Sequence, residues 1–162
     1  MKWQIKNRWS GSIIFEAEIE CGEGEPTGVK LGLALIQARD NGANLSGANL
    51  SGVPRISNIH QAVYSAATSV PGALDMSSWH SSCGTAHCRA GWVVTLAGDA
   101  GRALEWAMGT PAAATIIYIA SDPTIEKVPN FYADNDAALA DMAAMAKAER
   151  ARSASAEQPT GA

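Results

Sequence analysis

The predicted fold is organised around one stretch of the chain, Trp79-His80-Ser81-Ser82-Cys83-Gly84-Thr85-Ala86-His87-Cys88-Arg89-Ala90-Gly91-Trp92. It holds two of the three histidines and two of the three cysteines, between two of the five tryptophans. Thr85 is a residue type that caps helices, and it predicts a helix over 86–97 with Gly98 as its stop. We therefore expect this stretch to join a loop to a helix, with further helices on either side.

Cap and stop residues predict those further helices. Asn58 is expected to cap one of them, and Thr110-Pro111 is a cap followed by proline at the first helical position. The last helix is expected to be capped by Asp134 or Asn135. The other expected ranges are 27–41, 59–70, 100–108 and 112–120.

Helical periodicity also predicts which side chains face the core. Val70 is expected to face inward at the end of the helix over 59–70, and Leu139 is expected to do the same in the last helix. His60, in a first helical turn, is interpreted as a surface residue. Residues 151–162 contain no large apolar side chain, so we expect them to be a disordered tail.

Residues 2–20 predict a β-hairpin, because apolar and polar side chains alternate on both sides of Ser10-Gly11-Ser12. A three-residue turn centred on Gly11 would place a basic strand beside an acidic one, with Lys2 opposite Glu20. A slip of one residue would reverse both faces, so we expect an odd-length loop. The helix over 27–41 is expected to cover the apolar face.

After this helix, Ala43-Asn44-Leu45-Ser46-Gly47 is followed at once by an identical copy, Ala48-Asn49-Leu50-Ser51-Gly52. The tandem repeat resembles the pentapeptide-repeat family, whose central Leu and preceding Ala point into a square right-handed β-coil. The resemblance implies that Leu45, Leu50, Ala43 and Ala48 point inward. Two copies are too few for a solenoid, so we expect a remnant or at most half a coil.

The resemblance extends further along the chain. The hairpin, the helix, the repeat and the later Trp79–Trp92 stretch together look like a group of small bacteriophage and prophage proteins, over about residues 1–150. The group implies a context rather than a reaction: an accessory protein of a phage, acting in the bacterial cytoplasm. The DNA-mimicking role of long pentapeptide-repeat proteins is not carried over to so short a repeat.

The composition excludes several classes of protein. At 162 residues, with 47% apolar and 17% charged side chains, the chain is expected to bury a core. Its net charge of −4 argues against binding to nucleic acid through phosphates. No apolar run approaches the roughly 20 residues of a membrane span, and no signal peptide is expected. Three cysteines fit no disulfide framework, which favours a reducing cytoplasm.

We therefore expect an α+β protein in three parts. Residues 1–56 would form the hairpin, one helix and the vestigial repeat, and residues 57–150 an α-helical region of four or five short helices. Residues 151–162 would be the tail. Because a two-stranded sheet has exposed edges, we also expect a homodimer paired through the hairpin.

Three hypotheses about the central stretch stay open, and the first is a zinc site. His80, Cys83, His87 and Cys88 are ligand types that zinc prefers. Adjacent residues on a helix point about 100° apart, so His87 and Cys88 do not converge easily. Zinc is therefore the one cofactor considered, and the expectation favours no cofactor.

The second hypothesis is nucleophilic catalysis. Cys88 would lie in the first turn of the helix capped by Thr85, where the helix dipole lowers the pKa of a thiol. His80 would act as the base, with Asp75 as the candidate that orients it. The arrangement does not follow a known cysteine hydrolase family, so a metal- or cysteine-dependent enzyme is the alternative rather than the favoured function.

The third and favoured hypothesis is a binding site. Trp79 and Trp92 would pack across the joint, and one of them would stack a base. Thr85, His87 and Arg89 would lie at a helix N-terminus, which favours an anion such as phosphate. In a phage protein this predicts non-enzymatic binding of a nucleotide-like signal or of a host defence protein.

Overall fold

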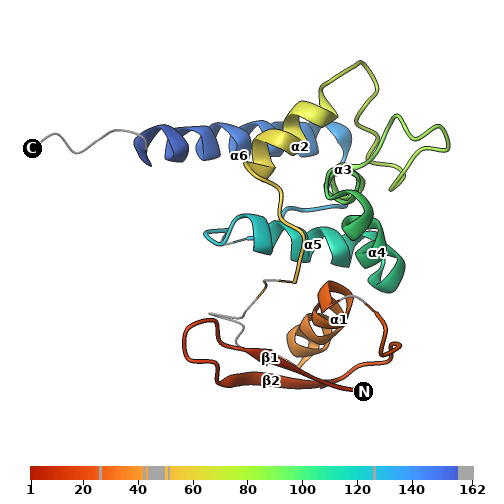
Figure 1. Cartoon of the computed structure of the whole chain (residues 1–162). Coiled ribbons are helices and arrows are strands. Elements are labelled where there is room, and N and C mark those ends of the chain that lie inside the picture. Colours follow the sequence, from red (N-terminus) through yellow and green to blue (C-terminus); the bar gives the residue numbers. More distant parts are fainter. Residues whose placement is uncertain (26, 42, 44–49, 51, 126, 157–162) are drawn as a thin grey trace, which may run out of the picture.

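The computed structural model describes residues 1–25, 27–41, 43, 50, 52–125 and 127–156. Over these residues an antiparallel two-stranded hairpin precedes six helices, which confirms the α+β class (Figure 1). The hairpin and α1 form one end of the molecule, α2 and α6 form the other, and α5 lies between them. The elements are β1 (Lys2–Lys6), β2 (Ile13–Glu18), α1 (Thr27–Asp40), α2 (Ile59–Ala67), α3 (Arg89–Leu96), α4 (Gly98–Met108), α5 (Thr110–Ser121) and α6 (Asn135–Ala156).

The strands pair in a register that differs by two residues from the predicted one. Lys2 lies opposite Glu18 instead of Glu20, so the predicted pairing is wrong. Because side chains alternate with a period of two, this shift keeps residues 2–5 and their partners on their predicted faces. A bulge between Ile5 and Lys6 then places Lys6 opposite Ile13, which is 54% exposed rather than packed on the core. Ile5 and Ala17 are both fully buried on the face that meets the core.

The turn explains the change of register. The side-chain Oδ1 of Asn7 accepts the backbone N–H groups of Trp9, at 2.9 Å, and Ser10, at 3.0 Å. Such an Asx turn reverses the chain early, and Gly11 completes it with a φ of 71°. The loop therefore begins at Asn7, three residues before Ser10, where the alternation of side chains alone had placed its start.

One hydrophobic cluster runs from the hairpin to the last helix. α1 packs against both strands, which confirms that it covers the hairpin, and it also packs against α4 and α5. Gly32 of α1 has no room for a side chain, since a Cβ there would lie 2.1 Å from Met108 Cε. The N-terminal part and the helical part thus share a single core.

Most of the pentapeptide repeat, including Leu45 and Ala48, lies outside the described residues. Leu50 is buried in the hydrophobic cluster, and Ala43 packs against that cluster. The half-coil that the repeat implies stays a prediction.

The C-terminal helix differs from expectation in two ways. α6 includes residues 151–156, which were predicted to be a disordered tail; the remaining residues, 157–162, lie outside the described part. Leu139 is 37% exposed instead of facing the core. The predicted cap is confirmed, because Asp134 Oδ1 accepts the N–H of Ala137 at 2.8 Å. The helical part of the tail was misjudged because alanine and arginine favour helix even without large apolar side chains.

α2 corrects two further expectations about burial. α2 ends at Ala67, so Val70 lies beyond it and is 57% exposed rather than packed inward. His60 is only 3% exposed and is not a surface residue. Among the described helices, none has the length and apolar character needed to cross a membrane.

Candidate functional site

The central stretch does join a loop to a helix, but the helix begins later than predicted. α3 begins at Arg89, and Cys88 is its N-cap, with Sγ accepting the N–H of Gly91 at 3.3 Å. Thr85 is exposed in the preceding loop, and His87 forms an isolated β-bridge rather than a helical turn. The predicted cap at Thr85 is wrong because the thiol of Cys88 takes that role.

His80 and His87 face each other across this joint. Their Nδ1 atoms are 2.8 Å apart, and His80 Nε2 lies 2.7 Å from Glu105 Oε1 on α4. On the far side, His87 Nε2 lies 3.2 Å from the carbonyl oxygen of Gly84. Thr110 Oγ1 donates to the same Glu105 oxygen at 2.5 Å. These side chains, His80, His87, Glu105 and Thr110, are called the histidine joint below.

The partners of the histidine joint determine where its protons lie. A carbonyl oxygen only accepts, so His87 Nε2 carries a proton, and a neutral His87 must then accept at Nδ1. The proton between the two rings therefore belongs to His80 Nδ1, and His80 Nε2 shares a further hydrogen bond with the carboxyl group of Glu105. Burial lowers the pKa of His87, and the neighbouring His80 lowers it further. The joint is thus a hydrogen-bonded chain that runs from Glu105 through His80 and His87 to the carbonyl oxygen of Gly84.

The two cysteines of the stretch differ in reactivity. Burial raises the pKa of Cys88, whose thiol is 1% exposed and already bonded to Gly91. Cys83 is exposed, and hydrogen bonds with Ser81 and Thr85 lower its pKa to about 7. Its Sγ lies 2.9 Å from Thr85 Oγ1. Cys88 therefore has the properties of a structural cap, and Cys83 is the more reactive thiol.

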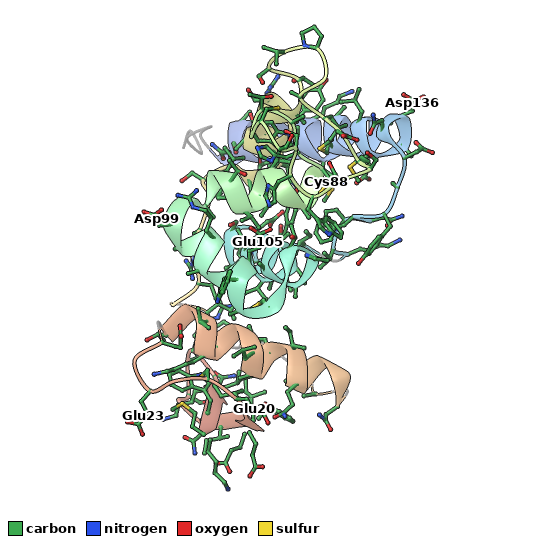
Figure 2. All side chains as sticks on the ribbon, turned by 90° about the vertical axis from the view of Figure 1, so that its right-hand side faces the viewer. Glu20, Glu23, Cys88, Asp99, Glu105 and Asp136 are labelled. Carbon is green, nitrogen blue, oxygen red and sulfur yellow. The ribbon has the colours of Figure 1, made fainter. Side chains whose placement is uncertain are left out.

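The four candidate zinc ligands do not converge. His80 and His87 point toward each other, whereas Cys83 and Cys88 bond to groups of their own local turns. In the described part of the chain, no three His, Cys, Asp or Glu side chains form a group that could hold a metal ion. Figure 2 shows Cys88 and Glu105 in the helical part of the molecule, well away from the hairpin end. The zinc hypothesis gains no support from this geometry.

Trp79 and Trp92 have separate partners instead of packing on each other. Trp92 meets His87 edge to face, with ring centroids 4.5 Å apart, and donates from Nε1 to the carbonyl oxygen of Ala73 at 2.9 Å. Trp79 meets the edge of Tyr132 at 5.7 Å. Both tryptophans therefore hold the loop against its surroundings.

Arg89 points away from the joint toward α5 and α6. Its side chain is 1% exposed. Nε donates to Tyr118 Oη at 3.2 Å, Nη1 to Asp141 Oδ2, and Nη2 to Met145 Sδ at 3.0 Å. The predicted trio of Thr85, His87 and Arg89 is thus divided, because the Arg89 side chain runs into the helical core.

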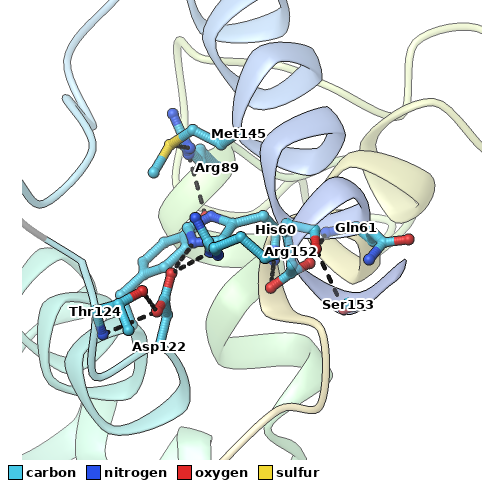
Figure 3. A network of polar contacts seen from close by, with 10 residues as sticks. His60, Gln61, Arg89, Asp122, Thr124, Met145, Arg152 and Ser153 are labelled. Atoms are coloured by element: carbon cyan, nitrogen blue, oxygen red, sulfur yellow. Dashed lines mark hydrogen bonds and ion pairs between the residues drawn. The ribbon is translucent and has the colours of Figure 1, made fainter. Parts of the chain in front are cut away.

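A second polar network surrounds Asp122, just after α5 (Figure 3). Its Oδ2 lies 2.9 Å from His60 Nε2 and accepts from Arg152 at 2.9 Å. Its Oδ1 accepts the backbone N–H of Thr124 at 3.0 Å and the hydroxyl at 2.6 Å. Burial opposes the charged form, yet the hydrogen bonds from Thr124 and His60 keep the pKa of Asp122 below its usual value. Asp122 is therefore a buried carboxylate that remains ionised.

His60 is fixed by its helix and by its ring. The carboxylate of Glu149 on α6 accepts the backbone N–H groups of His60, at 3.3 Å, and Gln61, at 2.9 Å. It thereby caps α2, whereas the side chain of the predicted cap, Asn58, makes no such bond. The His60 ring stacks on Tyr118, and its Nδ1 has no hydrogen-bond partner among the described residues.

The Arg89 and Asp122 networks form the walls of one groove of about 620 Å³, called the polar groove below. Its charged and titratable lining includes His60, Arg89, Asp122, Asp141 and Arg152. Its apolar lining comes from the segment after Asp122 and from α6. Grooves of this volume, apolar with a few convergent polar groups, are the usual sites of small ligands.

Sequence reasoning missed most of this groove because its residues are scattered along the chain. Only Arg89 belongs to the stretch that the sequence singles out. His60 was assigned to the surface, and Asp122 lies just beyond the helix expected over 112–120. The Asp122-Pro123 dipeptide after an apolar helix is the one signal that marked a structured helix end here.

Comparisons with protein-family models, curated proteins and solved structures found no match to this chain. The phage context and the hairpin-mediated homodimer therefore stay predictions. The functional argument consequently depends on the chemistry of the polar groove and the histidine joint.

Proposed function

We propose that this protein acts by non-enzymatic binding, and that the polar groove takes a small ligand with a negatively charged group. The observation that carries the proposal is the burial of the Arg89 guanidinium in the wall of a groove of about 620 Å³. A buried cation requires a counter-ion, and a groove beside it gives an external anion access to that position.

The charges of the groove support an anionic ligand. Arg89, Lys127 and Arg152 line it, against the carboxylates of Asp122 and Asp141. The chain as a whole carries a net charge of −4, so these cations form a local exception. Cationic side chains therefore outnumber the two aspartates in the groove, which favours an anion there.

A nucleotide-like signal, the ligand class expected from the sequence, also fits the charges and the apolar lining of the groove. Phosphate groups pair with guanidinium groups, and the apolar lining from α6 and the segment after Asp122 suits a base or sugar. Sequestration of such a signal in phage–host conflict is our proposal for the biological role. Blocking a host defence protein is the other form of the same binding role.

Catalysis is less well supported. Cys88, the candidate nucleophile, is buried, has a raised pKa and already accepts a hydrogen bond from the helix that it caps. His80, the candidate base, has both ring nitrogens bonded to His87 and Glu105. Neither residue presents a free reactive group to a substrate.

Calorimetry and thermal shift with cyclic dinucleotides and ADP-ribose test the proposal. Binding at 100 times Kd should stabilise the fold by about 2.7 kcal/mol. Arg152→Gln should weaken binding about tenfold, since a hydrogen bond to a charged group contributes about 1.5 to 3 kcal/mol. The matched control is Arg102→Gln, which removes an exposed arginine paired with Asp99 on α4. Equal weakening by both variants, or binding of no anionic probe, would contradict the proposal.

A further inference from the structure

The ion pair between Arg89 and Asp141 is unequal in exposure. The Arg89 side chain is 1% exposed, whereas the Asp141 side chain is 54% exposed. A guanidinium in this environment cannot be left without an anion, because an unpaired buried charge is strongly destabilising. The half-exposed carboxylate on α6, by contrast, is well solvated if it turns away.

The outer edge of Arg89 is only partly used by the protein. Nε is bonded to Tyr118 Oη, but Nη1 has the single oxygen Oδ2 of Asp141, and Nη2 faces the thioether sulfur of Met145. A thioether is a weak acceptor, whereas a guanidinium readily donates two parallel hydrogen bonds to one oxyanion. The two Nη atoms therefore have donor capacity that Asp141 and Met145 do not fully use.

The residues at this edge belong to the wall of the polar groove. Arg89, Asp141 and Met145 all line the groove. Tyr118, which holds Nε, is fully buried and stacks on His60 behind the wall. Figure 3 draws Arg89 and Met145 together with the network around Asp122, and Arg89 and Arg152 both line the groove.

We propose that Arg89 is an oxyanion receptor and that Asp141 is its exchangeable counter-ion. A phosphate or carboxylate of the ligand displaces the Asp141 carboxylate and accepts from both Nη1 and Nη2. Asp141 turns into solvent, while Arg89 keeps its bond to Tyr118. This inference rests on the proposed binding function and adds the chemical class of the group bound and the residue that binds it.

The exchange explains the roles of the two carboxylates in the groove. Asp122 stays in place, because Thr124 and His60 both bond to it from the protein side. Asp141 has one bonded partner among the described residues, Arg89 itself. Asp141 is therefore the carboxylate that an incoming anion replaces.

Asp141→Asn tests the exchange with inorganic phosphate and pyrophosphate as probes, against sodium chloride of equal ionic strength. The variant removes the competing charge but keeps the side chain's size. In chloride its melting temperature should fall below that of the wild type, and phosphate should restore it. Phosphate should also bind about tenfold more tightly than to the wild type. The matched control is Asp99→Asn, which removes an exposed aspartate paired with Arg102 and should change neither quantity.

A second measurement uses the wild-type chain and does not depend on the folding of a variant. In ¹⁵N-resolved NMR of arginine side chains, phosphate should shift the Nε–Hε signal of Arg89 and leave that of Arg102 unchanged. Unchanged phosphate affinity in Asp141→Asn, or an equal gain in Asp99→Asn, would overturn the exchange. If one of these results is found while nucleotides still bind and Arg152→Gln still weakens their binding, the exchange alone is overturned and the binding function stands. If no anion binds at all, both proposals fail.

Discussion

The histidine joint and the polar groove are two polar clusters in one helical region, and they differ in how fully the protein satisfies them. In the joint, each of the four ring nitrogens of His80 and His87 lies within hydrogen-bond distance of a partner. In the groove, His60 Nδ1 has none in the described part of the chain, and Arg89 Nη2 has only a sulfur. A closed network holds a fold together, whereas an open one leaves groups that a ligand can satisfy.

The sequence had placed the binding site in the Trp79–Trp92 stretch, whereas the less satisfied polar groups lie in the polar groove. The reactive residues concentrated between Trp79 and Trp92 bond mainly to one another or to nearby backbone, because they are close in the chain. The groove draws its residues from α2, α3, α6 and the segment between α5 and α6, so its groups are held by separate elements. Groups fixed on separate elements can face a common space without bonding fully to each other.

The largest expected effect on stability comes from a substitution that disturbs the loop carrying the histidine joint. Gly91→Ala would place a Cβ 2.0 Å from the carbonyl oxygen of Trp79 and 3.1 Å from His87 Cβ. Because the first neighbour is backbone, the loop must move, and we expect the free energy of unfolding to fall by about 3 kcal/mol. Urea unfolding followed by tryptophan fluorescence measures this.

Gly24→Ala is the control for that substitution, since a Cβ at Gly24 meets nothing within 4 Å. It should leave the free energy of unfolding within about 0.5 kcal/mol of the wild type. If Gly91→Ala were equally mild, the loop would not be locked against α3 as described.

A smaller effect is expected from pH. His87 has a lowered pKa in the fold, so the unfolded chain binds its proton first as the pH falls below about 6.5. Stability is therefore full above that value and is lost toward lower pH, by at most about 1.4 kcal/mol per pH unit for one proton. Protonating both histidines would also place two N–H groups head to head, with Glu105 as the one carboxylate bonded to His80.

Urea unfolding between about pH 7.5 and about pH 5.5 measures this dependence. His87→Gln removes the titrating group and should flatten the profile in this range. Asp122, whose pKa is lowered from 3.8, titrates below the range and does not contribute to it. A wild-type protein that gained stability toward pH 5.5, or a variant with an unchanged slope, would show that His87 is not the neutral member of the joint.

Local patterns predicted the fold well where one element decides the outcome. Pro111 located the start of α5, although Gly109 and not the predicted Thr110 is its N-cap. Asp134 capped α6 and strand alternation located the hairpin, since each depends on residues near in sequence. The errors occurred where a distant or unusual partner took a role. Glu149 replaced Asn58 as the cap of α2. It accepts the backbone N–H of His60, which lies 89 residues away in the sequence.

The candidate site was harder to predict for the same reason. Arg89 was predicted to bind an anion, but its partners Tyr118, Asp141 and Met145 lie on two other helices. Nothing in the local sequence of His60 shows that α6 and Asp122 enclose it. A single sequence indicates which residues are able to bind an anion, whereas the packing of α6 on α2 decides which of them line a groove.

The smallest expected effect concerns Cys83 and leaves the stability of the fold unchanged. Its pKa of about 7 predicts that alkylation by iodoacetamide reaches half its maximal rate near that pH, while the buried Cys88 reacts slowly. Ser81 is the largest cause of the lowered pKa, so Ser81→Ala should slow alkylation at neutral pH several-fold. Ser82→Ala, at an exposed neighbour in the same loop, is the matched control. Peptide mass spectrometry assigns each modified cysteine. Titration of Cys83 near its ordinary value of 9.0, or equal slowing by both serine variants, would mean that the loop does not hold Ser81 and Thr85 around the thiol.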